Sequence, residues 1–228
     1  MKKIIISEKQ LKHIVKEMAY PTTFNMDEFK SLSSFQKRIE YCKQRLKKLG
    51  AGTSRIVFEI DNEKVLKLAK NSKGIAQNQE EIRLGSDYYT KSLGCFAEVY
   101  DYDEQGLFVE MEKALPAKER DFERLTGYPF EMYCDFITRC AKNYLPNNRN
   151  RYYFINHAYD EAYQECINDE YSFIYNVMDY MSNYQLTTWG DLTRISSYGV
   201  VKRNGQEELV IIDFGLTEDV YNNFYGKR

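Results

Sequence analysis

The sequence has few of the residues that several common chemistries require. It has two histidines, His13 and His157, and neither has a metal-ligand neighbour at useful spacing; we therefore expect neither zinc chemistry nor a Ser-His-Asp site. Its five cysteines are an odd number with no Cys-x-x-Cys pair, which argues against a disulfide scaffold and favours a reducing cytosol. No run of 18 apolar residues occurs, and Ile4–Ile6 is too short for a signal-peptide core, so we expect no membrane span and no secretion signal.

An excess of charge of one sign is also missing. The 32 basic and 34 acidic residues give a net charge of −2, which disfavours a nucleic-acid binder that relies on positive charge. Apolar residues make up 43% and aromatic residues 15% of the 228 residues, enough for a packed core in one domain or two small lobes. Residues 1–50 are locally basic, with 12 basic and 5 acidic side chains. This stretch is either a solvated helix face or an arm that docks on an acidic partner.

Periodicity predicts helices before residue 50 and strands after it. A short strand and a helix fill residues 1–20 and end at Pro21, and a second helix runs from Ser34 to Leu49 with Ser33 and Gln36 as its cap. After residue 50 we expect four strands, 55–60, 64–69, 97–102 and 107–112, and one helix inserted between them, 74–92.

The rest of the chain reads as helices followed by a hairpin. Residues 117–186 are mostly helical, with an Asn-rich break at 145–150 and one apolar stripe formed by Ile167, Tyr171, Ile174, Met178 and Met181. The strands 200–202 and 209–213 flank Asn204-Gly205, which is a type I′ turn signal.

Three features in the strand-rich part are suited to binding phosphate. Gly50 and Gly52 lie in a turn that feeds a strand, where the missing Cβ lets the backbone approach a phosphate closely. Lys67 stands inside an apolar strand: either it points out from a half-exposed strand, or it is buried and its ammonium needs an anionic partner. Glu80 and Glu81 follow in the next helix, and either can pair with Lys67; we favour Glu81 because it leads directly into Ile82.

Two further carboxylates lie toward the end of the sequence. An apolar strand ends in Asp213-Phe214-Gly215, and a carboxylate at a strand end suits Mg²⁺. Asp191 lies 22 residues earlier, in the loop Trp189-Gly190-Asp191-Leu192-Thr193-Arg194.

In this order the features resemble the protein-kinase-like superfamily over about residues 46–218. The resemblance implies an α+β, two-lobed fold: an antiparallel-sheet N-lobe with one inserted helix and a reduced helical C-lobe. It implies ATP and Mg²⁺ as cofactors. It matches Gly50 and Gly52 to the Gly-rich loop, Lys67 and Glu81 to the paired residues on strand and helix, Glu110–Glu112 to the adenine hinge, Asp191 to the catalytic base, and Asp213 to the metal ligand.

Several positions depart from the family pattern. The Asn expected five residues after Asp191 is Ser196, a poorer magnesium ligand, so a one-metal site held mainly by Asp213 is expected. Thr193 replaces a lysine, and Arg194 beside it can neutralise the transferring phosphate. Arg55 replaces the third glycine of the loop. Only 13 residues, 216–228, follow Gly215, so we expect a cut-down second lobe without a peptide-substrate platform.

The sequence favours two functions; for a third, transfer of AMP rather than phosphate, no particular residue argues. One is an ATP- and Mg²⁺-dependent phosphotransferase that acts on a hydroxyl of a protein or a small molecule. The other is a non-catalytic kinase-like docking module, for which the N-terminal arm contacts a protein partner. We expect three parts: an arm at 1–30, an N-lobe at 31–112 and a C-lobe at 113–228.

More narrowly, the chain resembles compact kinase-like proteins of tailed-phage genomes, on the basis of residues 74–78 and the loop 190–199. That resemblance implies the cytoplasm of a bacterial host, with virion association as the alternative. Residues 152–193 have no Lys or Arg but seven acidic residues. This is either a solvated face or a surface that attracts a basic substrate such as an aminoglycoside or a Lys-rich peptide.

Overall fold

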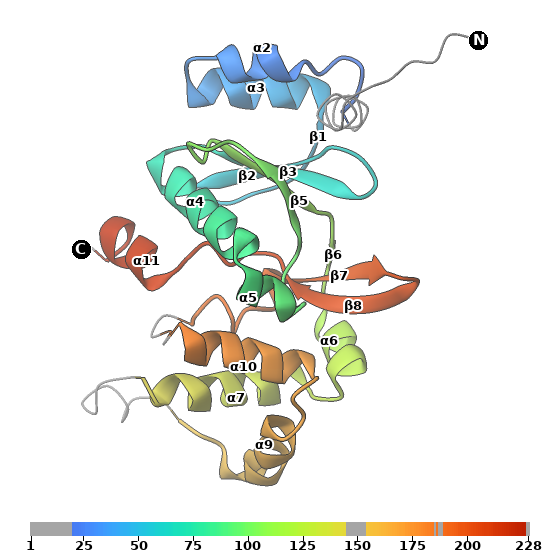
Figure 1. Cartoon of the computed structure of the whole chain (residues 1–228), viewed down its shortest axis with the longest axis vertical. Coiled ribbons are helices and arrows are strands. Elements are labelled where there is room, and N and C mark those ends of the chain that lie inside the picture. The colour runs from blue at the N-terminus through green and yellow to red at the C-terminus, as the bar shows by residue number, and fades with distance from the viewer. Residues whose placement is uncertain (1–19, 145–153, 185, 187–188, 227–228) are drawn as a thin grey trace.

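The computed structural model describes residues 20–144, 154–184, 186 and 189–226. Its first part is built on a five-stranded antiparallel sheet in the order β1-β2-β3-β5-β4 (Figure 1). The strands are β1 (Lys47–Ala51), β2 (Arg55–Glu59), β3 (Lys64–Ala69), β4 (Val99–Tyr102) and β5 (Phe108–Glu112). The four strands expected from the sequence are therefore confirmed with small shifts of their ends, and β1 is an addition.

Two helices, α2 (Met26–Ser31) and α3 (Phe35–Arg45), cover one face of this sheet. Side chains at alternate positions of β3, Leu66 and Leu68, pack there against Phe29 and the α3 face, as strand geometry requires. The predicted helix 34–49 is too long, because the chain after Leu46 forms the edge strand β1 and pairs with β2. The predicted cap is one residue off: the Ser34 hydroxyl, not that of Ser33, accepts the Lys37 amide at 3.2 Å.

The expected arm at 1–30 falls partly outside the described residues, since 1–19 are not described. Its described end belongs to the first lobe: Tyr20, Phe24 and Phe29 are buried in the cluster between α2, α3 and the sheet. The strand and helix expected within 1–20 cannot be compared with the structure.

Helix α4 (Ser72–Ser86) lies against the opposite face of the sheet (Figure 1). Its buried positions recur at helical spacing, at Gln77, Asn78, Glu81 and Leu84. The helix expected at 74–92 is split, because the Asp87 carboxylate accepts the Thr90 amide at 2.8 Å and caps a new short helix, α5 (Tyr88–Ser92).

The second part contains α6 (Glu119–Thr126), α7 (Phe130–Lys142), η1 (His157–Tyr159), α9 (Asp160–Ile167) and α10 (Phe173–Asn183). Ile174, Met178 and Met181 are buried along α10, as the predicted stripe requires. Tyr171 is not in the stripe: it lies in the turn before α10 and is 93% exposed. The predicted break at 145–150 lies outside the described residues.

A small three-stranded sheet joins the two parts, with β6 (Leu115–Pro116), β7 (Tyr198–Arg203) and β8 (Gln206–Ile211) in that order. The predicted hairpin is confirmed: β7 pairs with β8 in an antiparallel register, and both Asn204 (φ 51°) and Gly205 (φ 83°) have the positive φ that a type I′ turn needs. The short η2 (Ile195–Ser197) precedes β7, and α11 (Glu218–Phe224) follows β8.

These elements form the two-lobed α+β arrangement predicted from the sequence: an antiparallel sheet with one inserted helical segment, α4 and α5, followed by a helical second lobe (Figure 1). No helix among the described residues is both long enough and apolar enough to cross a membrane.

Candidate functional site

A cleft of about 780 Å³ lies between the five-stranded sheet and the second lobe. Side chains from both lobes line it, and they divide by chemistry. Apolar groups come from Val57, Val65, Ala97, Met111 and Ile212; charged groups come from Arg55, Lys67, Asp191, Arg194 and Asp213. Its volume is within the range of small-ligand and cofactor sites.

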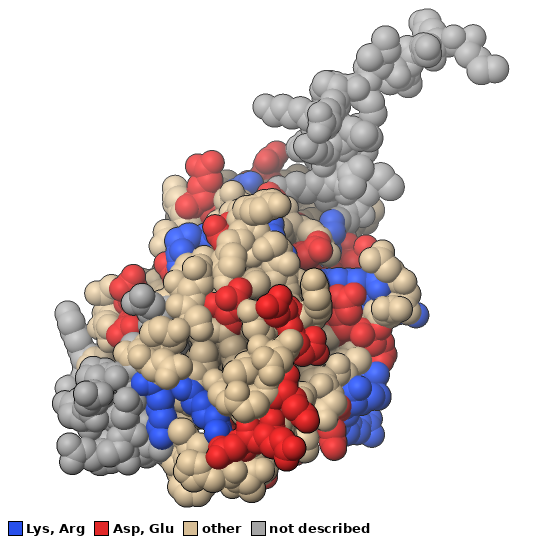
Figure 2. All heavy atoms as spheres, turned by 60° about the horizontal axis from the view of Figure 1, so that its bottom comes forward, with Lys and Arg blue, Asp and Glu red and all other residues tan. Residues whose placement is uncertain are grey.

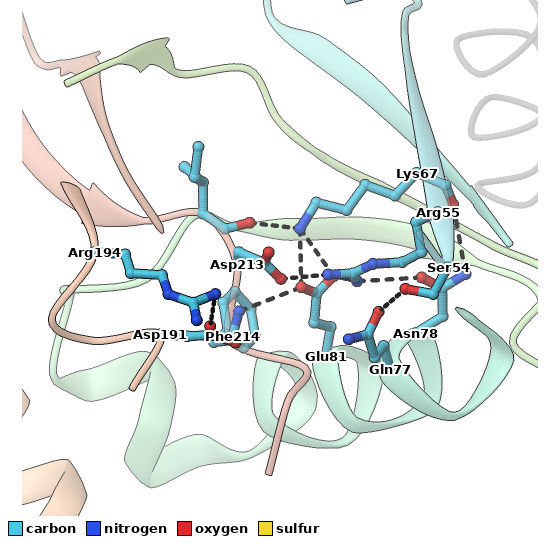
Figure 3. Close-up of polar contacts among 11 residues, drawn as sticks. Ser54, Arg55, Lys67, Gln77, Asn78, Glu81, Asp191, Arg194, Asp213 and Phe214 are labelled. Atoms are coloured by element: carbon cyan, nitrogen blue, oxygen red, sulfur yellow. Dashed lines mark hydrogen bonds and ion pairs between the residues drawn. The ribbon is translucent and has the colours of Figure 1, made fainter. Parts of the chain in front are cut away.

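Lys67 points from the middle of β3 into this cleft, because it lies on the opposite face of the strand from Leu66 and Leu68. Its ammonium donates to both Glu81 oxygens, at 2.9 and 3.0 Å, and to the Ile212 carbonyl at 2.5 Å (Figure 3). Burial lowers the pKa of Lys67, and the Glu81 carboxylate opposes that effect. The buried lysine therefore has the anionic partner that its sequence context called for.

Glu81, rather than Glu80, is that partner. Glu81 is fully buried, and one of its oxygens also accepts the Phe214 amide at 3.3 Å. Glu80, one position earlier, lies on the outer side of α4, where it pairs with Arg83 at 2.9 Å. The difference follows from helical spacing, because Glu81 continues the buried face formed by Gln77 and Asn78.

Arg55 is the site residue whose role the sequence reasoning missed. It begins β2 on the same sheet face as Lys67, it is 6% exposed, and its guanidinium contacts Glu81 at 2.7 Å and the Asp213 carboxylate (Figure 3). Burial acts to lower its pKa, but Glu81 and Asp213 outweigh burial and raise it. The available signal was a charged residue in place of the third loop glycine, two positions before the inward-facing Val57.

Asp213 follows β8 and reaches the charged end of the cleft. Burial acts to raise its pKa, but the cations Arg55 and Lys67 outweigh burial and lower it. About half of the side chain, 48%, remains exposed in the cleft. The carboxylate is therefore ionised at neutral pH and accessible to a ligand.

The two residues after Asp213 attach this segment to the rest of the core. The Phe214 ring packs edge-on against Phe96 with centroids 5.0 Å apart. At Gly215 an added Cβ would lie 2.3 Å from the Gln77 carbonyl oxygen of α4. Only glycine permits this close approach, so the Asp-Phe-Gly segment is held directly against the helix that carries Glu81.

Asp191 lies on the second-lobe side of the cleft. The Arg194 guanidinium donates to it at 3.0 Å (Figure 3). Burial and the nearby Asp213 charge raise the pKa of Asp191, against the effect of Arg194. Arg194, expected at the transferring phosphate, is placed on Asp191 and also lines the cleft.

The loop that carries Asp191 is held by buried aromatic residues. Trp189 and Leu192 are buried at either side of Asp191. The fully buried Tyr198 hydroxyl donates to the Leu192 carbonyl at 2.6 Å and lies 2.5 Å from the Tyr133 hydroxyl. These contacts fix the backbone next to Asp191 without using its carboxylate.

The residues expected to bind Mg²⁺ are Asp213 and Ser196. Both line the cleft, and Ser196 is exposed there in η2. Mg²⁺ commonly takes one or two carboxylates and completes its shell with water and substrate phosphates. One carboxylate and one hydroxyl fit such a site; no cluster of three or more His, Cys, Asp or Glu exists among the described residues.

The Gly-rich turn lines the cleft on the side of the five-stranded sheet. Gly50 lies in β1 and Gly52 in the turn that follows, where its amide donates to the Arg55 carbonyl at 2.9 Å. An added Cβ at either glycine would meet no atom within 4 Å. The space next to the turn is therefore open, as close approach of a ligand requires.

The expected hinge residues are divided between the two faces of β5. Met111 and Glu112 line the cleft, and Glu112 pairs with Arg203 at 2.6 Å. The Glu110 side chain lies outside the cleft, because it faces the α2–α3 side and accepts the Tyr20 hydroxyl at 2.7 Å. Strand alternation explains why Met111 and Glu110 face opposite ways, since Glu110 is paired in register with Leu66 of the α2–α3 face. It does not explain the position of Glu112, the last residue of β5, which lines the cleft although it is two residues after Glu110.

Two tyrosines that the sequence analysis did not single out also line the cleft. Tyr221 and Tyr225 of the C-terminal segment stack with their ring centroids 6.4 Å apart. The Lys73 ammonium of α4 lies 4.4 Å from the Tyr225 centroid. In the sequence, their spacing of four residues indicates that the two rings lie next to each other if this segment is helical.

The acidic stretch in the second lobe is a surface feature. Glu161, Glu165, Asp169 and Glu170 are exposed on and after α9, and Figure 2 shows acidic atoms gathered at this end of the molecule. None of the described acidic residues from 154 to 190 lines the cleft. This placement fits the solvated-face interpretation.

Comparisons with known proteins find distant likenesses. No protein-family model and no curated protein matches the chain. Among solved structures, a GDP complex of wild-type aminoglycoside 2'-phosphotransferase-IIIa aligns over 86% of this chain and 72% of its own, with 17% identity and a TM-score of 0.35. A gentamicin complex of APH(2")-IIa aligns over 94% and 71%, with 13% identity and a TM-score of 0.34. These values are too low to assign a family or an activity.

Proposed function

We propose that the protein is an ATP- and Mg²⁺-dependent phosphotransferase. The observation that carries the proposal is the placement of four charged groups around one cleft: Lys67 paired with the buried Glu81, and Asp213 and Asp191 at the same end. The apolar end of the cleft accommodates a flat base, and the charged end accommodates phosphates. Preorganised charges of this kind are what phosphoryl transfer requires of a protein.

Each residue has one role in this proposal. Lys67 binds the phosphates of the nucleotide, and Glu81 orients it. The amides around Gly50 and Gly52 cover the phosphates, and Asp213 with Ser196 holds Mg²⁺, which neutralises charge on the phosphate oxygens.

Asp191 acts as the base. A hydroxyl oxygen of the acceptor forms a bond to the terminal phosphorus while the bond from that phosphorus to the bridging oxygen breaks, and the nucleoside diphosphate leaves. The hydroxyl proton passes to the Asp191 carboxylate. The raised pKa of Asp191 suits this step, because a proton acceptor is more effective as its pKa approaches the working pH.

The acceptor is a hydroxyl of a protein or a small molecule. We give priority to small, basic, polyhydroxylated molecules in the assays. The acidic residues exposed on and after α9 lie on the second lobe, and a surface of that charge attracts cationic acceptors. Aminoglycosides are a practical first set, since gentamicin and streptomycin are bound in similar solved structures, and a Lys-rich peptide with serine is the protein counterpart.

The alternative is a non-catalytic docking module, and one observation favours it. Both carboxylates that the reaction needs are already paired with arginines, Asp213 with Arg55 and Asp191 with Arg194. In that case the protein acts through its N-terminal arm, either in the host cytoplasm or as a component of a phage particle.

A thermal-shift experiment tests the proposal. Unfolding is followed with and without Mg²⁺-ATP for the wild type and Lys67→Ala. A ligand at about 100 times its Kd adds about 2.7 kcal/mol, which for a chain of this size raises Tm by roughly 5–10 °C. The expected result is a magnesium-dependent rise that Lys67→Ala loses. No shift in the wild type contradicts nucleotide binding.

Turnover separates the two functions. Asp191→Asn keeps the size of the side chain but cannot accept the proton, so it should abolish transfer and leave the nucleotide-induced shift intact. A docking module predicts that deletion of residues 1–19, which leaves the buried Tyr20 in place, removes the biological role while Asp191→Asn has no effect.

A further inference from the structure

We propose that Arg55 is a second fixed cation for the nucleotide phosphates, and that it reduces the dependence of nucleotide binding on Mg²⁺. The inference rests on the proposed function, because it concerns the same cleft. It assigns to Arg55 a binding role that its position in place of a loop glycine does not imply.

The geometry puts the Arg55 guanidinium beside the Lys67 ammonium. Arg55 and Lys67 come from neighbouring strands and share one face of the sheet, and both contact the Glu81 carboxylate, at 2.7 and 2.9 Å. Both line the cleft, although each is almost fully buried. A phosphate that reaches Lys67 is therefore also close to the guanidinium, whose planar fork suits phosphate oxygens.

The charges of this cluster are balanced before any nucleotide binds. Arg55 and Lys67 face Glu81 and Asp213, which are two positive and two negative groups. Incoming phosphates bring additional negative charge to this cluster, in which the side chains of Arg55 and Lys67 lie next to each other against Glu81 (Figure 3). Both cations are already ordered in the folded protein, so binding of phosphate requires no further loss of side-chain entropy from Arg55 or Lys67.

The same contact changes how Asp213 interacts with a metal ion. Arg55 bonds to one carboxylate oxygen of Asp213 and places a positive charge beside it. That charge repels an incoming divalent cation, so Asp213 attracts Mg²⁺ less than a free carboxylate does. Ser196, in place of an amide ligand, weakens a second metal position further. A fixed cation at Arg55 therefore compensates in phosphate binding for weaker metal binding.

The test measures ATP affinity by calorimetry, once with excess Mg²⁺ and once with EDTA. The proteins are the wild type, Arg55→Met, Arg55→Lys and the control Arg83→Met. Arg83 lies on α4 but is half exposed, pairs with Glu80 and does not line the cleft. Circular dichroism and Tm establish that each variant is folded before its affinity is compared.

We expect the wild type to bind ATP measurably in EDTA. Arg55→Met should weaken that metal-free binding by roughly tenfold to a hundredfold, the usual effect of one charge-assisted hydrogen bond. It should weaken binding in Mg²⁺ by less, so the ratio of the two dissociation constants rises. Arg55→Lys keeps the charge and should raise the ratio less, and Arg83→Met should leave it unchanged.

Three outcomes contradict the inference. A ratio that is unchanged or smaller in Arg55→Met means that Arg55 is only a structural partner of Asp213. A wild-type affinity that falls by more than roughly a thousandfold in EDTA means that Mg²⁺, not Arg55, supplies the charge, and this result needs no folded variant. Absence of wild-type binding under both conditions overturns the proposed function as well, whereas binding under both with an unchanged ratio overturns only the role of Arg55.

Discussion

The substitution Glu81→Gln tests the charged cluster most directly. Glutamine has nearly the size of glutamate, so the change removes the negative charge with little change in packing. Glu81 is fully buried and contacts Lys67 at 2.9 and 3.0 Å, Arg55 at 2.7 Å and the Phe214 amide at 3.3 Å. The variant therefore keeps two buried cations with Asp213 as their remaining carboxylate in the cluster.

The magnitude follows from this change in charge. The cluster passes from neutral to one excess positive charge in a buried position, and breaking a buried ion pair in this way costs about 3–5 kcal/mol. The glutamine amide group adds to the cost, because its N–H atoms face donors. For a chain of this size we expect Tm to fall by roughly 6–20 °C.

The neighbouring Glu80 offers a matched control. Glu80→Gln makes the same chemical change one residue earlier, where Glu80 pairs with Arg83 within α4 and the two side chains are 21% and 52% exposed. A pair of that kind contributes at most about 1 kcal/mol, so Tm should change by a few degrees at most. Urea denaturation of the two variants and the wild type, followed by circular dichroism, gives the two free-energy changes on one scale.

Two outcomes of the comparison between Glu81→Gln and Glu80→Gln would contradict this reasoning. If Glu81→Gln lies within about 1 kcal/mol of Glu80→Gln, the buried carboxylate does not hold the cluster together, and the interpretation of Lys67 and Arg55 as preorganised cations is wrong. If Glu80→Gln is the more destabilising variant, the register of α4 against the sheet is wrong.

Three other substitutions or conditions have defined outcomes. Because Asp191 must be ionised to accept a proton and its pKa is raised, transfer should fall as pH decreases through a pKa above 3.8, which a pH–rate profile measures; a flat profile down to that pH excludes Asp191 as the base. Gly215→Ala puts a Cβ 2.3 Å from a backbone oxygen of α4 and should cost about 1–3 kcal/mol in urea denaturation, whereas Gly190→Ala, whose Cβ meets nothing within 4 Å, should cost less than half of that. Glu110→Gln should leave ATP affinity within about twofold, because its side chain lies outside the cleft, and a larger loss would place it at the hinge.

Of the features of the site, the sequence predicts best which side chains of a strand lie on the same face, because side chains alternate along a strand. An ammonium in an apolar strand needs an anionic partner if it faces inward, and the next helix offers Glu80 and Glu81 for that role. The inward orientation of Lys67 is one of the two alternatives that the sequence leaves open. Arg55 is the first residue of the strand predicted at 55–60, but the family resemblance treats it only as the replacement of a loop glycine, so no partner is predicted for its guanidinium. The structure begins β2 there, and alternation then turns the guanidinium inward.

Other parts of the site depend on contacts between distant segments. The ends of helices and strands near residue 46 are set by the pairing of β1 with β2, which local periodicity does not contain. The placement of Arg194 on Asp191, and of Tyr221 and Tyr225 at the cleft, depends on how the chain returns after β8. No spacing rule within one segment predicts these approaches.

The contacts between α4 and the Asp-Phe-Gly segment have a consequence for how the site works. Lys67 donates to the Ile212 carbonyl, Glu81 accepts the Phe214 amide, and Gly215 lies directly against the Gln77 carbonyl. The helix that carries Glu81 and the segment that carries Asp213 are therefore attached to each other at several points. Under the proposed function, a nucleotide therefore meets the Lys67–Glu81 pair and Asp213 already held in one arrangement.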